Sequence, residues 1–177
     1  MDTENKEVMD IADLMTLDLE GVEAKYDIRL QPGKYLMKVA DAELDTIDTE
    51  KDGVIPVVKW QFEVVKCVDL DKDTDEDGEE INLDTFVGAM IYNTSWLRDQ
   101  LSQGKLVGFI KSVTGSHPKG GLNDVLSTMK TEDTFAIMRV NHRKNKDNPS
   151  MPYVNLSTNK KEIIGHAMLV EQGVIGG

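Results

Sequence analysis

The sequence predicts a mainly β domain, with a helical insertion between its third and fourth strands. Short segments alternate apolar and polar residues, as strands with one buried face do. Between residues 97 and 129 the apolar residues instead recur three and four positions apart, which is typical of amphipathic helices. The length of 177 residues and the hydrophobic fraction of 40% fit one globular domain with some additional terminal chain.

The first three strands are predicted at residues 34–44, 55–68 and 81–90, separated by a polar loop and an acidic connector. The second strand shows the clearest alternation, with apolar and polar faces formed by Val58, Trp60, Phe62 and Val64 and by Lys59, Gln61 and Glu63. We expect Trp60, Phe62 and Phe86 to be core residues, because they lie on apolar faces. The polar face of the second strand is then available to solvent or to a ligand.

Helical signals follow the third strand. Asn93-Thr94-Ser95 offers side-chain oxygens for an N-cap, and apolar stripes continue to Gly115 and again from Leu122 to Met129. A β-hairpin comes next. Its strands are predicted at 135–140 and 153–157, on either side of a polar tip rich in Asn, Asp and Pro.

The order of three strands, helices and two strands is the layout of a five-stranded OB-fold barrel. We place this domain at residues 29–161. Residues 1–28 are predicted to form an acidic arm, either partly helical or frayed. Residues 162–177 are predicted to be a partly disordered tail.

The formal net charge of −12 is unevenly distributed. Residues 1–32 carry −6, residues 41–52 carry −5 and residues 69–84 carry −8, whereas residues 139–161 carry +5. Local fields steer charged ligands more than the total charge does. The hairpin is therefore a basic island in an acidic protein, and an anionic ligand is expected there.

Several classes of protein are disfavoured by what the sequence lacks. The apolar runs are too short to span a membrane, and the acidic N-terminus does not resemble a secretory signal. The single cysteine, Cys67, excludes an internal disulfide and a cysteine-based zinc site. We therefore expect a cytoplasmic protein with no membrane contact.

No catalytic signature surrounds the three histidines, and no phosphate-binding glycine motif is present. We expect neither an enzyme nor a cofactor. The acidic connector matches part of an EF-hand calcium loop, with candidate ligands Asp73, Asp75, Asp77 and Asp84. The flanking segments are predicted to be strands rather than helices, so a solvated loop is the default interpretation and no metal site is assigned.

Nucleic-acid binding requires cations that follow the phosphates and aromatic faces on which bases stack. The hairpin offers such groups in Arg139, His142, Arg143, Lys144, Lys146 and Tyr153. Lys38, Lys59 and Gln61 would join them if the first two strands lie alongside. The alternative is that basic residues at a hairpin tip only aid solubility and protect a sheet edge.

The chain as a whole also resembles a known family. The similarity covers residues 17–158 and is carried by L-D-L-E-G-V-E-A, L-Q-P-G-K-Y, V-A-D-A-E, W-Q-F-E-V-V and the 135–142 and 153–156 strands. These segments are similar to phage-encoded single-stranded DNA-binding proteins with an OB-fold. The resemblance implies sequence-tolerant binding of single-stranded DNA during phage replication or recombination, and contacts with the phage proteins of those processes. It carries over to Lys38, Lys59, Gln61, residues 139–146 and Tyr153.

One departure from the family concerns its acidic C-terminal tail, which recruits partners. Residues 170–177 contain a single acid, Glu171. The acidic arm would then take that role, and deleting residues 1–16 would tighten DNA binding and abolish recruitment. Two other functions stay open: a phage structural or assembly module whose cationic hairpin docks an acidic protein, and a calcium-modulated module. The sequence also leaves open whether the protein forms a homo-oligomer.

Overall fold

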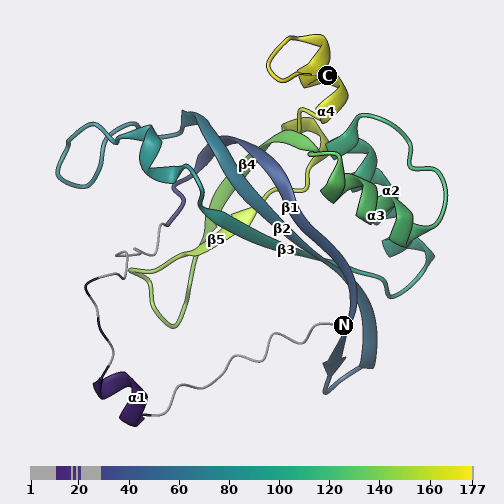
Figure 1. Ribbon diagram of the computed structural model, residues 1–177, viewed down its shortest axis with the longest axis horizontal. Coiled ribbons are helices and arrows are strands. Elements are labelled where there is room, and N and C mark those ends of the chain that lie inside the picture. The colour runs from purple at the N-terminus through teal and green to yellow at the C-terminus, as the bar shows by residue number, and fades with distance from the viewer. Residues whose placement is uncertain (1–10, 17, 19, 21–28, 177) are drawn as a thin grey trace.

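A computed structural model describes residues 11–16, 18, 20 and 29–176 of the chain (Figure 1). Its helices are α1 (Ile11–Met15), α2 (Gln100–Thr114), α3 (Leu122–Thr131) and α4 (His166–Glu171), with 3-10 turns η1 (Leu83–Phe86) and η2 (Lys160–Glu162). Its strands are β1 (Gly33–Thr49), β2 (Gly53–Leu70), β3 (Met90–Trp96), β4 (Phe135–Arg143) and β5 (Tyr153–Leu156). Most of the predicted acidic arm lies outside the described residues. The part that is described includes α1, whose Ile11 and Met15 are exposed.

The five strands form one antiparallel sheet in the order β3-β2-β1-β4-β5. The mainly β class and the helices between the third and fourth strands are as predicted. The sheet is not closed into a barrel, because within the described chain no hydrogen-bonded ladder joins β3 to β5. The two outermost strands of the sheet are therefore β3 and β5.

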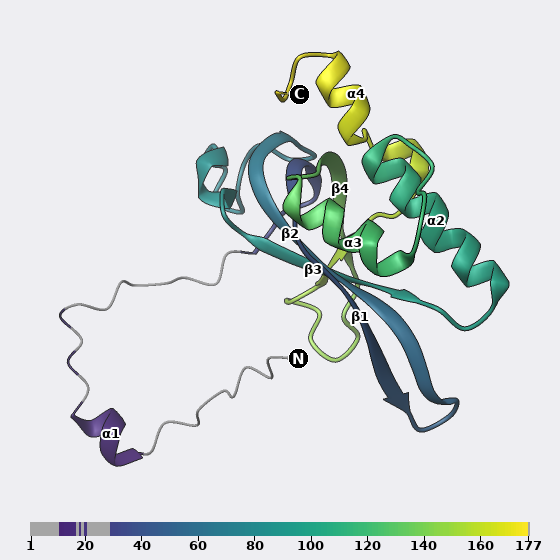
Figure 2. The same ribbon diagram turned by 45° about the vertical axis from the view of Figure 1, so that its right-hand side comes forward.

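Strands β1 and β2 form a long hairpin that projects beyond the rest of the sheet (Figure 2). The prediction of a polar loop over residues 45–53 was wrong, because β1 continues to Thr49. The chain turns only after that residue, at Asp52-Gly53, where β2 begins. There the amide of Asp52 donates to the hydroxyl of Thr49 (3.0 Å), and Gly53 has a φ of +73° that a side chain would disfavour. Three register shifts bend the hairpin closer to its base, which lets one end cover the core while the other projects.

The third strand was predicted too early in the chain. Residues 81–90 instead contain η1, because the side chain of Asn82 accepts the amide of Asp84 (3.1 Å). Gly88, with a φ of +85°, then reverses the chain before β3 begins at Met90. The Asn93-Thr94-Ser95 segment is consequently part of β3 rather than a helix cap.

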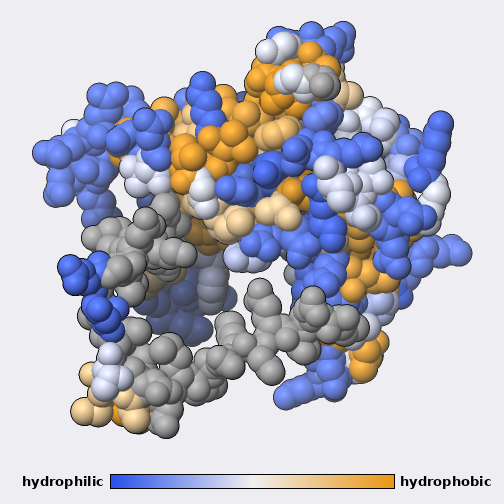
Figure 3. Space-filling view, in the orientation of Figure 1, coloured by the Kyte–Doolittle hydropathy of each residue, from blue (hydrophilic) through white to orange (hydrophobic). Residues whose placement is uncertain are grey.

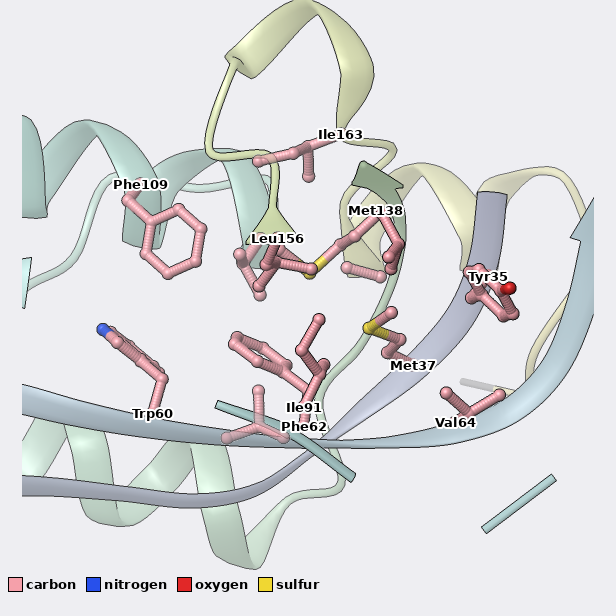
Figure 4. Packing of buried hydrophobic residues seen from close by; sticks show 14 of the residues in the cluster. Tyr35, Met37, Trp60, Phe62, Val64, Ile91, Phe109, Met138, Leu156 and Ile163 are labelled. Atoms are coloured by element: carbon pink, nitrogen blue, oxygen red, sulfur yellow. The ribbon is translucent and has the colours of Figure 1, made fainter. Parts of the chain in front are cut away.

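The N-cap of α2 is Asp99, whose carboxylate accepts the amide of Ser102 at 2.8 Å. This bond lowers the pKa of Asp99. Helix α2 places Phe109 against the indole of Trp60 and the ring of Phe62, at centroid distances of 5.2 and 6.3 Å. Figure 4 shows these rings packed with side chains from the sheet and from the C-terminal segment. The prediction that Trp60, Phe62 and Phe86 are core residues is confirmed.

The C-terminal segment is packed on the sheet, so the expected partial disorder was wrong for residues 162–176. Ile164 exchanges two backbone hydrogen bonds with Ile137 of β4 (2.9 and 3.0 Å). Helix α4 then buries Leu169 completely against Leu36 and Ile137 on the outer face of the sheet. A Cβ on Gly165 would overlap the carbonyl oxygen of Ser112, so only glycine lets this segment approach the end of α2.

Candidate functional site

A groove separates the two edge strands, β3 and β5. We call it the tyrosine groove, and it has a volume of about 540 Å³. Its lining is formed by Arg29, Leu30, Met90, Ile91, Tyr92, Asn145, Asn148, Met151, Pro152, Tyr153 and Val154. The two tyrosines are 69% and 56% exposed, whereas Trp60 is 1% exposed. Tyr92 and Tyr153 are thus aromatic faces that a planar ligand can reach.

The exposure of Tyr92 follows from the register of β3 on β2. Tyr92 is paired with Gln61 and Thr94 with Lys59, so these four side chains share the outer face. Ile91 is paired with Phe62 and points into the core. The prediction that Lys59 and Gln61 lie on one face is therefore confirmed, and the structure adds a tyrosine beside them.

The basic tip of the hairpin forms one side of the groove. Arg143 lies directly opposite Tyr153 in the β4–β5 ladder. The loop that follows is held by Asn145, whose side chain accepts the amides of Asp147 and Asn148 and donates to the carbonyl of Met151 (3.1 to 3.2 Å). Arg143, Lys144 and Lys146 are exposed, and no described residue forms an ion pair with them. Arg29, which also lines the groove, is half-buried and likewise forms no ion pair with a described residue.

Three of the other predicted cations are already compensated by carboxylates. The pairs are Lys38 with Asp133 (3.9 Å), Lys59 with Asp45 (2.8 Å) and Arg139 with Asp71 (2.8 Å). The hydrogen bond from Lys59 lowers the pKa of Asp45, and the bond to Asp71 raises the pKa of Arg139. A phosphate near any of these cations would have to compete with a carboxylate, so they contribute less to an anion site than the free hairpin cations do.

The imidazole of His142 is hydrogen-bonded to the protein backbone and is not free to bind a ligand through Nε2. Its Nε2 lies 2.7 Å from the carbonyl oxygen of Leu30. A carbonyl only accepts, so Nε2 must carry the proton and donate it. The bond ties the chain entry at Arg29 and Leu30 to the end of β4, which places both residues in the lining of the groove.

A larger cavity lies elsewhere, beside the loop that connects β2 to η1. It measures about 610 Å³ and its lining includes Asp71, Asp75 and Glu76. Hydrophilic side chains cover this loop at the left of Figure 3. These carboxylates would repel a phosphate, so we do not place an anion site there despite the larger volume.

The four candidate calcium ligands are not brought together. The carboxylate of Asp75 accepts the amides of Asp77 and Glu79 (both 2.9 Å), and Asp84 lies in η1. Among the described residues no group of three or more His, Cys, Asp or Glu side chains is placed to hold a metal ion. Asp73 to Asp77 therefore form a hydrogen-bonded turn.

Among the described residues, each helix is too short or too polar to span a membrane.

Sequence reasoning missed Tyr92, Arg29 and Trp96. The signal for the two aromatic residues is present in the alternation of Met90, Tyr92, Thr94 and Trp96, but the predicted strand begins nine residues too early. Arg29 gave no such signal, because its position depends on the distant His142. Comparison of the chain with protein-family models, curated proteins and solved structures finds no match in any of the three.

Proposed function

We propose that the protein binds single-stranded DNA in the tyrosine groove, without catalysing a reaction. The observation that carries the proposal is the pair of exposed tyrosines beside four cations that have no carboxylate partner among the described residues. Stacking on aromatic side chains is tolerant of sequence because every base has a π-face. The cations Arg29, Arg143, Lys144 and Lys146 would follow the phosphates.

The strand order supports a partly open OB-fold as the scaffold. Pairing β3 with β5 would close the sheet β3-β2-β1-β4-β5 into a five-stranded barrel, and both strands already line the same groove. In OB-folds, strands 2 and 3 and the loops joining strands 1 to 2 and 4 to 5 bind oligonucleotides. Tyr92 and the 144–152 loop occupy the corresponding places.

The distribution of acids supports one path for the ligand. Residues 69–84 carry −8. Their loop follows the C-terminal end of β2, at the opposite end of that strand from the β1–β2 turn (Figure 1). Residues 41–52 carry −5 on the projecting hairpin. The 69–84 region repels DNA more strongly, because Asp41, Asp45 and Asp52 of the 41–52 region have cationic partners, and this leaves the groove as the favoured surface. The resemblance to phage proteins supports a role in replication or recombination in the host cytoplasm.

The test is a titration with fluorescent oligothymidylate of the wild type and of Tyr92→Ala and Tyr153→Ala. Loss of one stacking contact costs about 1 to 3 kcal/mol, so each variant should bind at least about fivefold more weakly. Tyr92→Phe and Tyr153→Phe keep the ring and should retain affinity. Met168→Ala, an exposed residue of α4 outside the groove, is the matched control for surface substitution.

Two results would overturn the proposal. One is an absence of binding by the folded wild type at low salt. The other is equal loss of affinity in the tyrosine-to-alanine variants and the Met168→Ala control. A further variant replaces Arg143, Lys144 and Lys146 by glutamate. If the wild type binds an acidic protein and this variant does not, and neither binds DNA, the cationic hairpin is a protein-docking surface.

A further inference from the structure

A second groove continues along the same strand, with a volume of about 440 Å³. We call it the tryptophan groove. Its lining from β3 is residues 93–96, and its opposite wall is the first half of α2 with Lys105. The tyrosine groove takes its β3 lining from residues 90–92. The two linings therefore follow one another along β3, one ending at Tyr92 and the other beginning at Asn93.

The aromatic residues of the two grooves lie on the same face of β3. Tyr92 and Trp96 lie four residues apart on the outer face of β3, paired with Gln61 and Val57. At about 3.3 Å per residue, this separates them by about 13 Å along the strand. Trp96 is 36% exposed, so part of its ring is open to a ligand.

The cations of the tryptophan groove differ in how they are held. The guanidinium of Arg98 lies 5.0 Å from the centroid of the Trp96 ring and 3.4 Å from the carboxylate of Asp52. It covers one face of the indole and keeps the ring in place. Lys105 is exposed and has no ion pair with a described residue. Asp99, the N-cap of the helix, accepts the amide of Ser102, and Lys105 is near enough to help lower the pKa of its carboxyl.

From this continuity we infer that the two grooves form one track, and that its ligand is a single strand long enough to reach from the hairpin tip to the start of α2. The inference rests on the proposed function and adds a second subsite to it. Trp96 offers the stacking face and Lys105 the phosphate contact. A short oligonucleotide occupies only the tyrosine groove, because Tyr92, Tyr153 and most of the unpaired cations lie in that groove or beside it.

The experiment compares two oligothymidylates, of about 4 and about 16 nucleotides, which bracket the site sizes of OB domains. The long probe should bind the wild type more tightly than its extra registers alone explain. Trp96→Ala should weaken the long probe about fivefold or more and leave the short probe unchanged. Lys105→Gln should lower the salt slope of the long probe by about 0.7 and leave that of the short probe.

Lys111→Gln is the matched control, because it removes the same charge from the same helix outside the groove. Trp96→Phe keeps a ring and should retain most of the long-probe affinity, which separates stacking from a loss of folding. If the short probe binds and depends on Tyr92, but the long probe ignores Trp96 and Lys105, the track is refuted and the proposed function stands. If neither probe binds, both are refuted.

Discussion

Arg29 in the tyrosine groove and the three cations of the adjoining hairpin tip predict how strongly salt weakens binding. Each phosphate contact releases counterions, and for single strands the slope of log K against log salt is about −0.7 per contact. Four contacts, from Arg29, Arg143, Lys144 and Lys146, give a slope of about −2.8. Between about 50 and 200 mM salt the affinity for an oligothymidylate of about 5 nucleotides, which has four phosphate linkages, should then fall about 50-fold.

Neutralising three of these residues tests the assignment. In the variant Arg143→Gln, Lys144→Gln, Lys146→Gln one contact remains, so the slope should shrink to about −0.7 and the same change of salt should cost about threefold. The control is Lys51→Gln, Lys66→Gln, Lys111→Gln, which alters exposed lysines outside the groove. Both variants take the formal net charge from −12 to −15.

Fluorescence anisotropy at several salt concentrations measures both slopes. Equal slopes in the two variants would show that binding follows the total charge and not the groove. A wild-type slope near −5 would show that Lys38, Lys59 and Arg139 also contact phosphates in spite of their carboxylate partners.

Two further outcomes are expected. His142→Gln should bind DNA like the wild type while His142→Ala binds more weakly, because a glutamine amide can still donate to the carbonyl of Leu30 and an alanine cannot; equal affinities of the wild type and His142→Ala in the same titration would show that this bond does not position the groove. Leu169→Ala should lower the free energy of unfolding by about 2 to 5 kcal/mol without changing short-probe affinity, because it empties a closed site on Leu36 and Ile137; denaturation followed by circular dichroism measures this, and an unchanged midpoint would contradict the packing of α4.

Much of the fold could be predicted because local pattern and burial agree. The alternation around Trp60 identified both the strand and its buried face, and the periodicity around Phe109 identified a packed helix. The start of β3 could not be found this way. The apolar residues between 81 and 90 are spaced as in a strand. Asn82 and Gly88 instead impose a turn that depends on specific backbone bonds.

The candidate site was only partly predictable, for an electrostatic reason. Sequence shows where cations are but not which of them have partners. Arg139 and Asp71 are far apart in the chain, and their bond appears only when β4 lies beside β1. The hairpin tip was found because its charges are consecutive and depend on no such distant partner.

The connectivity of the sheet bears on when the groove comes into existence. The β1–β2 hairpin closes over a short turn, and its contacts are local. Joining β4 to β1 brings Gly33 beside Val140, across most of the domain. Closing so long a loop is slow, because its entropic cost precedes the contacts that repay it. The groove needs β5 in place, so a nascent or partly folded chain has nothing with which to hold DNA. If the proposed function holds, DNA binding would require complete folding, and bound DNA would in turn stabilise the fold by mass action.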